Sequence, residues 1–337
     1  MTKRGTVKRK LMGIVCPVAS LVRRSGVFVP LAACLAAASG CGGQHRPARP
    51  PATKPAVDRL AVGGAPVGLL AYRGSVWVAN ARTDRVMRID ERTGAVLARV
   101  RVGHIPLRLA GVAGRVFATN WGGRTMTVIS TAGASHATTV AVAPQPEGIT
   151  PLGSSLWLVS ERTGDLVEVS ANGHALSRVH VGHQPRQVTP AGSDLWVSVF
   201  GDDAVAEVNP RTGRVVARLK ACGGPQGLAS ASGQLWVACT TAGELVDVDP
   251  RSHDIVRRVS YQAADAVRAA GSSLLVTSDA GPATAVLDPR NGTLSDRMRL
   301  SSGYIADANA DVVAAGGSVW VSSPDEGVVY RIRRTVP

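Results

Sequence analysis

One pattern recurs seven times along this chain: an apolar triplet centred on a large side chain, with polar and glycine-rich segments between the copies. The central residues are Trp77, Phe117, Trp157, Trp196, Trp236, Leu275 and Trp320. Successive centres are 40, 40, 39, 40, 39 and 45 residues apart. A proline stands eleven residues ahead of each of the first five centres, and Ala264 and Asn309 replace it in the last two units. A fixed period of this length predicts stacked repeats around a shared core.

Each unit reads as four short strands. The third strand ends in a tight turn such as D-E-R-T-G at 90–94, where Asp opens the turn and Gly accepts a positive φ. Four antiparallel strands in about 40 residues are typical of a propeller blade. The last unit supplies only three strands, and the segment 57–62 supplies the fourth. Residues 56–337 are therefore predicted to form an all-β, seven-bladed β-propeller of four-stranded antiparallel blades, the last closed by an N-terminal strand.

The repeat also resembles a known family. The segments V-W-V-A-N at 76–80, V-x-x-I-D-x-x-T-G at 86–94 and V-x-V-G-x-x-P at 100–106 resemble the YVTN-type propeller proteins, which include bacterial periplasmic and surface proteins. The resemblance covers residues 56–337 and implies the same fold. Phe117 and Leu275 depart from the tryptophan pattern. Because the family is functionally diverse, the resemblance implies little about activity.

The N-terminus reads as a targeting segment. Residues 1–40 hold seven Lys/Arg and no Asp/Glu, followed within that stretch by an apolar run at 27–38 too short to span a bilayer. The run ends in A-S-G-C, which resembles a bacterial lipobox and predicts a signal peptide over 1–40 with lipidation of Cys41. Ala38 stands where Leu is favoured, so a secretory signal or an uncleaved anchor is the alternative. Residues 41–55 are expected to be a Pro/Gly/Arg-rich linker, and the domain an extracytoplasmic one, membrane-anchored or secreted.

The net charge of +14 belongs mostly to this segment. Residues 1–55 contain ten basic residues and no acidic ones, so the remaining 28 Lys/Arg face 24 Asp/Glu. A strong nucleic-acid binder needs a concentrated cationic surface. We therefore do not expect nucleic acid as a partner.

Five tryptophans share one repeat position and are expected to fill the wedge between blades. Trp121 differs, because it lies in the loop between the second and third strands of blade two and is expected to be exposed. Cys222 and Cys239 fall in loops that open on one face, which favours a disulfide in an oxidising compartment, with two free thiols as the alternative. The scattered histidines predict no metal site, and no cofactor is expected.

The loops between blades and those between second and third strands should share one face around the central channel, here called the loop face. Ligand-binding candidates on it are Arg108, Trp121, Arg124, Arg186, Asp202, Asp203, Tyr304 and Asp307. The same face should carry Arg82, Asp84, Glu161, Arg162 and Asp279. The irregular 45-residue spacing adds about five residues near 301–307, which points to that loop, with a neutral insertion as the alternative.

Two classes of function fit these features. The first is a monomeric binding or scaffolding module for a protein, glycan or small ligand. The second is a propeller enzyme, such as a streptogramin lyase or a lactone hydrolase. Streptogramin lyases use a His and Glu pair near the late blades, whereas the last histidine here is His253 in blade five. No G-x-S-x-G, Walker or H-E-x-x-H motif is present, so we assign no catalytic residue and expect a binding function.

Overall fold

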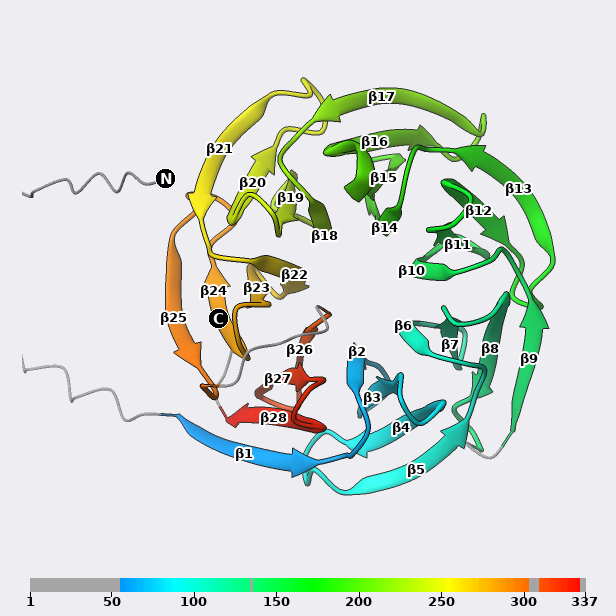
Figure 1. Cartoon of the computed structure of the whole chain (residues 1–337), viewed down its shortest axis with the longest axis vertical. Coiled ribbons are helices and arrows are strands. Elements are labelled where there is room, and N and C mark those ends of the chain that lie inside the picture. Colours follow the sequence, from blue (N-terminus) through cyan, green and yellow to red (C-terminus); the bar gives the residue numbers. More distant parts are fainter. Residues whose placement is uncertain (1–54, 134–135, 303–308, 334–337) are drawn as a thin grey trace, which may run out of the picture. The chain divides into compact units, whose positions relative to one another are not determined.

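A computed structural model describes residues 55–133, 136–302 and 309–333. In these residues 28 strands form seven four-stranded antiparallel sheets, arranged as blades in a ring (Figure 1). The seven-bladed propeller predicted from the repeat is confirmed. The predicted signal segment, Cys41 and most of the predicted linker lie outside the described residues.

The blades share one strand order from the channel outward. The innermost strands are β2 (Pro66–Ala71), β6 (Pro106–Val112), β10 (Pro146–Leu152), β14 (Pro185–Ala191), β18 (Pro225–Ala231), β22 (Ala264–Ala270) and β26 (Val312–Ala315). The second strands are β3 (Ser75–Asn80), β7 (Arg115–Asn120), β11 (Ser155–Ser160), β15 (Asp194–Val199), β19 (Gln234–Cys239), β23 (Ser273–Ser278) and β27 (Ser318–Ser323). The third strands are β4 (Arg85–Asp90), β8 (Thr125–Ser130), β12 (Asp165–Val169), β16 (Ala204–Asn209), β20 (Glu244–Val248), β24 (Ala283–Leu287) and β28 (Val328–Arg333). The outer strands are β5 (Val96–Arg101), β9 (Ala137–Ala141), β13 (Ala175–His180), β17 (Arg214–Lys220), β21 (Ile255–Ser260), β25 (Leu294–Arg299) and β1 (Ala56–Ala61). A short 3-10 helix, η1 (Phe200–Asp202), follows β15.

Both ends of the described domain meet in blade seven. Strand β1 pairs antiparallel with β28, with Val57 opposite Ile332 and Leu60 opposite Val329. The Arg333 side chain also donates to Asp58 at 2.8 Å. The pairing completes the seventh sheet and confirms the closure predicted from residues 57–62.

The core lies between the blades. The five tryptophans at the repeat centre are at most 2% exposed, and Phe117 and Leu275 are buried in the same way. Trp157, for example, packs with Val188 and Leu195 of the next blade. The indoles therefore fill the inter-blade wedges, as their shared position predicted.

Each of the first six innermost strands has a register shift just after its first residue; in β6 the pairing passes from Pro106 opposite Asn120 to Leu109 opposite Ala118. In blades two, four, six and seven a hydroxyl on the second strand accepts the buried N–H of the innermost segment. The bonds run from the backbone nitrogens of Arg108, Gln187, Ala266 and Asp311 to the hydroxyls of Thr119, Ser198, Thr277 and Ser322. Three of these hydroxyls donate onward to the next blade, to the carbonyls of Gln226, Ala310 and Val67. They link neighbouring blades around the channel.

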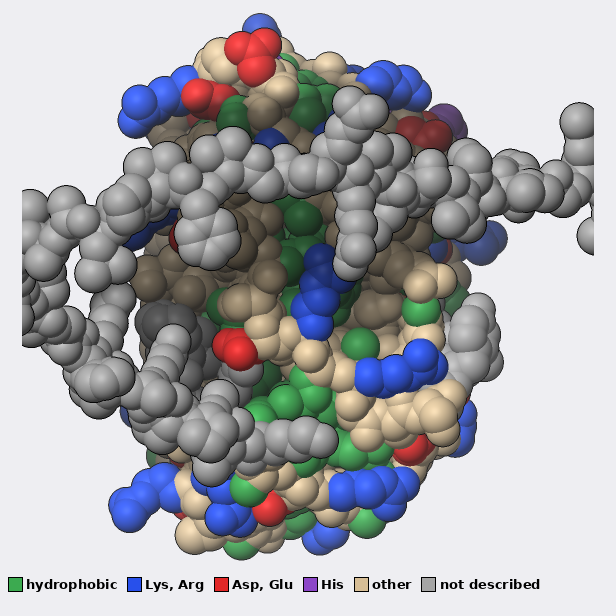
Figure 2. Space-filling model, turned by 90° about the vertical axis from the view of Figure 1, so that its left-hand side faces the viewer, with side chains coloured by type: hydrophobic (Ala, Val, Ile, Leu, Met, Phe, Trp, Pro, Cys, Tyr) green, Lys and Arg blue, Asp and Glu red, His purple; other side chains and the backbone are tan. Residues whose placement is uncertain are grey.

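The outer strands form the rim and carry many arginines. In β17 the outward positions hold exposed Arg214, Val216, Arg218 and Lys220, and the half-buried residues between them are apolar. On the side shown in Figure 2, Lys and Arg are dispersed over the rim instead of gathered into one basic surface. None of the described residues forms a helix long and apolar enough to cross a membrane.

Candidate functional site

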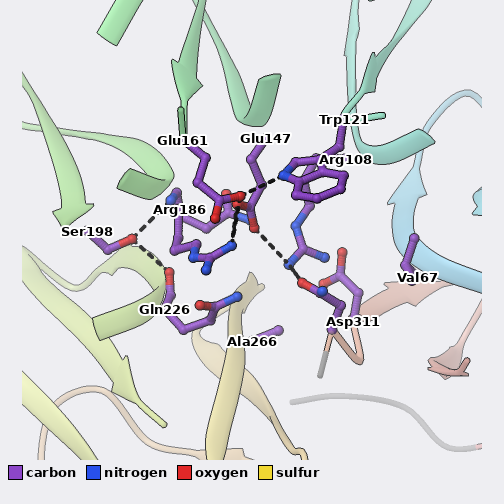
Figure 3. Close-up of polar contacts among 12 residues, drawn as sticks. Val67, Arg108, Trp121, Glu147, Glu161, Arg186, Ser198, Gln226, Ala266 and Asp311 are labelled. Carbon is purple, nitrogen blue, oxygen red and sulfur yellow. Dashed lines mark hydrogen bonds and ion pairs between the residues drawn. The ribbon is translucent and has the colours of Figure 1, made fainter. Parts of the chain in front are cut away.

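Three charged side chains meet in the channel, each one or two residues into an innermost strand (Figure 3). The Arg186 Nη1 atom lies 3.1 Å from Glu147 Oε2, and Arg108 Nη2 lies 3.9 Å from Glu147 Oε1. The Glu147 side chain is completely buried. Burial raises the pKa of its carboxyl, while the two guanidinium groups favour the charged form and limit that rise.

The contacts continue to the loop face and across the channel. Arg186 Nη1 lies 3.1 Å from Glu161 Oε2, and the indole nitrogen of Trp121 donates to the same oxygen at 2.6 Å. On the other side, Arg108 donates to Asn309 Oδ1 at 2.8 Å. We call these six residues the channel network; it joins blades two, three and four to the segment that enters blade seven.

A second ion pair lies deeper in blades six and seven. Arg268 donates to both carboxylate oxygens of Asp311, at 2.9 and 3.0 Å. Asp311 also accepts the backbone N–H groups of Leu69 and Val312. Burial alone would raise the pKa of Asp311, but Arg268, Arg108 and the Leu69 N–H together hold it below its ordinary value.

Two further carboxyls, Asp265 and Asp279, lie together in blade six and are 1% and 7% exposed. Burial raises the pKa of both, and the neighbouring charge of Asp279 raises that of Asp265 further, well above its ordinary value. Two adjacent buried carboxylates cannot both ionise cheaply, so the charge of one disfavours ionisation of the other. Within the described ranges no group of three or more His, Cys, Asp or Glu could hold a metal ion.

A pocket of about 420 Å³ opens on the loop face between blades two and three. Its lining includes His104, Ile105, Trp121, Arg124 and Arg162, and no carboxylate. We call it the loop-face pocket. Trp121 is half-buried, not exposed as its loop position had suggested, because its ring packs against a small apolar cluster and its nitrogen is bonded to Glu161.

The predicted site residues fall into three groups. Arg108, Trp121 and Arg186 come together in the channel network, and Arg124 lies beside Trp121 in the loop-face pocket. Asp202 and Asp203 belong to the loops around blade four, where Asp202 contacts His183 Nδ1 at 2.8 Å and Asp203 accepts the Gly224 N–H at 2.9 Å. Tyr304 and Asp307 lie outside the described residues. Asp279 was expected on the loop face but is buried.

The sequence analysis missed five residues of this site: Glu147, Asp265, Arg268, Asn309 and Asp311. In the repeat, all but Arg268 occupy the proline position or one of the two positions after it, and Arg268 lies four positions after it. Side chains there project toward the channel, so a comparison of these positions across the blades could have found them.

Cys222 and Cys239 are joined by a disulfide, with their Cα atoms 6.0 Å apart. In blade one the same two repeat positions hold Gly63 and Asn80. There the Asn80 side-chain amide donates to the Gly63 carbonyl at 2.6 Å. Blade five thus has a covalent bond where blade one has a hydrogen bond, between the inter-blade loop and the end of the second strand.

Neither a protein-family model nor a curated protein matches this sequence. Among solved structures, a streptogramin B lyase is 17% identical with a TM-score of 0.70, over 82% of this chain and 96% of that one. A catalytically inactive virginiamycin B lyase from Staphylococcus aureus, solved with quinupristin, is 14% identical with a TM-score of 0.69, over 82% and 99%. The WD40 propeller domain of Doa1 is 11% identical with a TM-score of 0.68, over 81% and 94%. At these identities the similarity establishes the propeller fold alone.

Proposed function

We propose that this chain is an extracytoplasmic, membrane-anchored propeller that acts as a monomeric binding or scaffolding module through its loop face. The observation that carries the proposal is the loop-face pocket, where a half-buried indole stands beside Arg124 and Arg162. Tryptophan and arginine are among the residue types that most often dominate binding energy, and here the indole is half-buried while both arginines are exposed.

A series of polar contacts fixes the indole at the pocket. The Trp121 ring nitrogen donates to Glu161, and Glu161 pairs with Arg186. Arg186 in turn pairs with the buried Glu147. Side chains fixed before binding lose less conformational entropy when a ligand arrives. This favours recognition by a preformed surface.

The N-terminal sequence supports the proposed location. The basic segment, the apolar run and the A-S-G-C motif at 38–41 favour export and lipidation of Cys41, and the following residues suit a spacer. Cys41→Ser should move the protein from the membrane fraction to the soluble extracytoplasmic fraction. Continued membrane retention of the variant would contradict the lipid anchor.

A capture experiment tests the binding function. The full chain is used as bait in an extract of its own cell envelope, beside a variant with Arg124→Glu and Arg162→Glu. A partner recovered by the wild type and lost in this variant supports the proposal. Arg82→Glu is the matched control, because Arg82 occupies in blade one the repeat position of Arg162 but does not line the pocket. Equal recovery by all three proteins would rule out the loop-face pocket as the contact surface.

An enzyme is the second candidate, favoured by the Asp265–Asp279 pair beside Arg108. A carboxyl whose pKa is raised by burial and by a neighbouring carboxylate is a candidate general acid. Because two structural neighbours are streptogramin lyases, quinupristin is the first substrate to test, with liquid chromatography and tandem mass spectrometry to separate and detect any product, including one of unchanged mass. Activity that disappears in Asp265→Asn would favour the enzyme, and an unchanged substrate after prolonged incubation would count against this activity.

A further inference from the structure

We infer that the loop-face pocket binds a small anionic ligand, a carboxylate or phosphate group joined to a ring that can stack on an indole. The inference rests on the proposed binding function of the loop face and names the chemistry of its ligand.

The charge of the pocket lining points to an anion. Arg124 and Arg162 both border the pocket, and in the described part of the chain neither guanidinium group has a hydrogen bond or an ion pair. A guanidinium group offers paired N–H donors whose geometry matches a carboxylate or a phosphate. Two such groups on one pocket provide donors for a single acidic group.

Two carboxylates that adjoin or contact the pocket residues already have partners. Glu161, next to Arg162, accepts from Trp121 and pairs with Arg186. Asp84 contacts the His104 imidazole at 3.2 Å and accepts the Ile105 N–H at 2.9 Å. Both carboxylates therefore already accept hydrogen bonds, whereas among the described residues the guanidinium groups of Arg124 and Arg162 have no such partner.

The indole of Trp121 indicates that the ligand carries a ring beside its acidic group. Its ring packs with the apolar cluster of Val67, Ala79 and Leu107 and also borders the pocket. Because the indole nitrogen donates to Glu161, the indole is held in one position, and the face of an aromatic or sugar ring can stack on it. The volume of about 420 Å³ lies at the lower end of the range for small-molecule sites, so one ring with one acidic group fits.

The ring can be aromatic or a sugar, and two anionic probes separate these sources. The full chain is titrated with phenyl phosphate and with glucuronate, with benzyl alcohol and glucose as the neutral counterparts, by ligand-observed NMR. At least one anionic probe should bind with a Kd of about 1 mM or tighter, and its neutral counterpart should not bind. Raising the salt concentration should weaken binding, because the donors are partly exposed.

Matched variants locate the site. Arg162→Gln and Arg124→Gln should each weaken the bound probe about tenfold, whereas Arg82→Gln should leave its affinity unchanged. Trp121→Leu should also weaken binding of the probe, because it removes the indole on which the ring of the probe stacks. Circular dichroism shows whether each variant keeps the strand content of the wild type.

Three results would overturn the inference: no binding of either anionic probe, equal binding of the neutral counterparts, or an equal loss in Arg82→Gln and Arg162→Gln. The capture experiment tests the proposed binding function independently of these three results. If the capture experiment still shows a partner that depends on the pocket, the function stands and only the anionic small ligand is wrong. If the capture also fails, both are wrong.

Discussion

Blade five offers a direct test of what fastens the inter-blade loop to its blade. Replacing Cys222 by Gly and Cys239 by Asn gives blade five the two residues that blade one has at Gly63 and Asn80. The disulfide spans a sequence separation of 17 residues. Closing a loop of that length in the unfolded chain stabilises the folded state by about 3 kcal/mol on the chain-entropy model.

The Gly/Asn variant should recover part of that loss. In blade one the Asn80 amide donates to Gly63 and its oxygen accepts from Ala65. A hydrogen bond of this kind contributes about 1 kcal/mol net. The Gly/Asn variant should therefore unfold with a free energy about 2 kcal/mol below the wild type, and a variant with alanine at both cysteines about 3 kcal/mol below it.

Urea unfolding of the full-length proteins, followed by tryptophan fluorescence under oxidising conditions, measures these differences. In melting temperature the Gly/Asn variant should lose roughly 4–8 °C. Reduction of the wild type should reproduce the alanine variant. If the Gly/Asn and alanine variants are equally stable, the Asn80 tether is not transferable between blades. If reduction leaves the wild type unchanged, the cross-link does not stabilise this fold.

Three further expectations concern the channel. Ser322→Ala leaves the buried Asp311 N–H without its acceptor. The variant should lower the free energy of unfolding by about 1–3 kcal/mol in urea titrations. An unchanged free energy of unfolding would mean that the hydroxyl does not link the blades. Glu147→Ala leaves Arg108 and Arg186 without their shared buried partner and should lower the free energy of unfolding by about 3–5 kcal/mol. A free energy of unfolding within about 1 kcal/mol of the wild type in the same assay would show that these ion pairs are not maintained. Asp265 has a raised pKa when folded, so the unfolded chain releases its proton first, and this residue makes stability fall as the pH rises above the ordinary value of 3.8. Asp265→Asn, which imitates the protonated acid, should gain stability relative to the wild type at pH 8 but not at pH 3, and a pH-independent difference in melting temperature would contradict the raised pKa.

The fold was predictable because its determinants repeat. The large side chain at each repeat centre, the turns that start with Asp or Asn, and the spare strand at 57–62 all reflect constraints that every blade must satisfy. Each of the seven blades must bury a large side chain against its neighbour. The same sequence pattern therefore occurs seven times, and it stands out even where one copy is irregular, such as the unit centred on Leu275.

The channel network was not predictable for the opposite reason. Glu147 and Arg186 occupy the same repeat position in neighbouring blades, where other blades have Val67, Gln226 or Asp265. These residues differ from blade to blade because each meets different neighbours across the channel. Arg108 was recognised as a candidate, but its link to Asn309, 201 residues away, follows only from the closure of the ring.

The pairing of β1 with β28 has a consequence for the order of folding. Its register joins residues at opposite ends of the domain, and the Arg333–Asp58 contact spans 275 positions. Contacts of such long range form slowly, since a large loop must close before they stabilise anything. Until β28 has emerged from the ribosome, β1 has no partner and blade seven is incomplete. A chain that loses residues 328–333 would expose both β27 and β1 as open edges, so we expect premature termination there to give aggregation instead of a six-bladed ring.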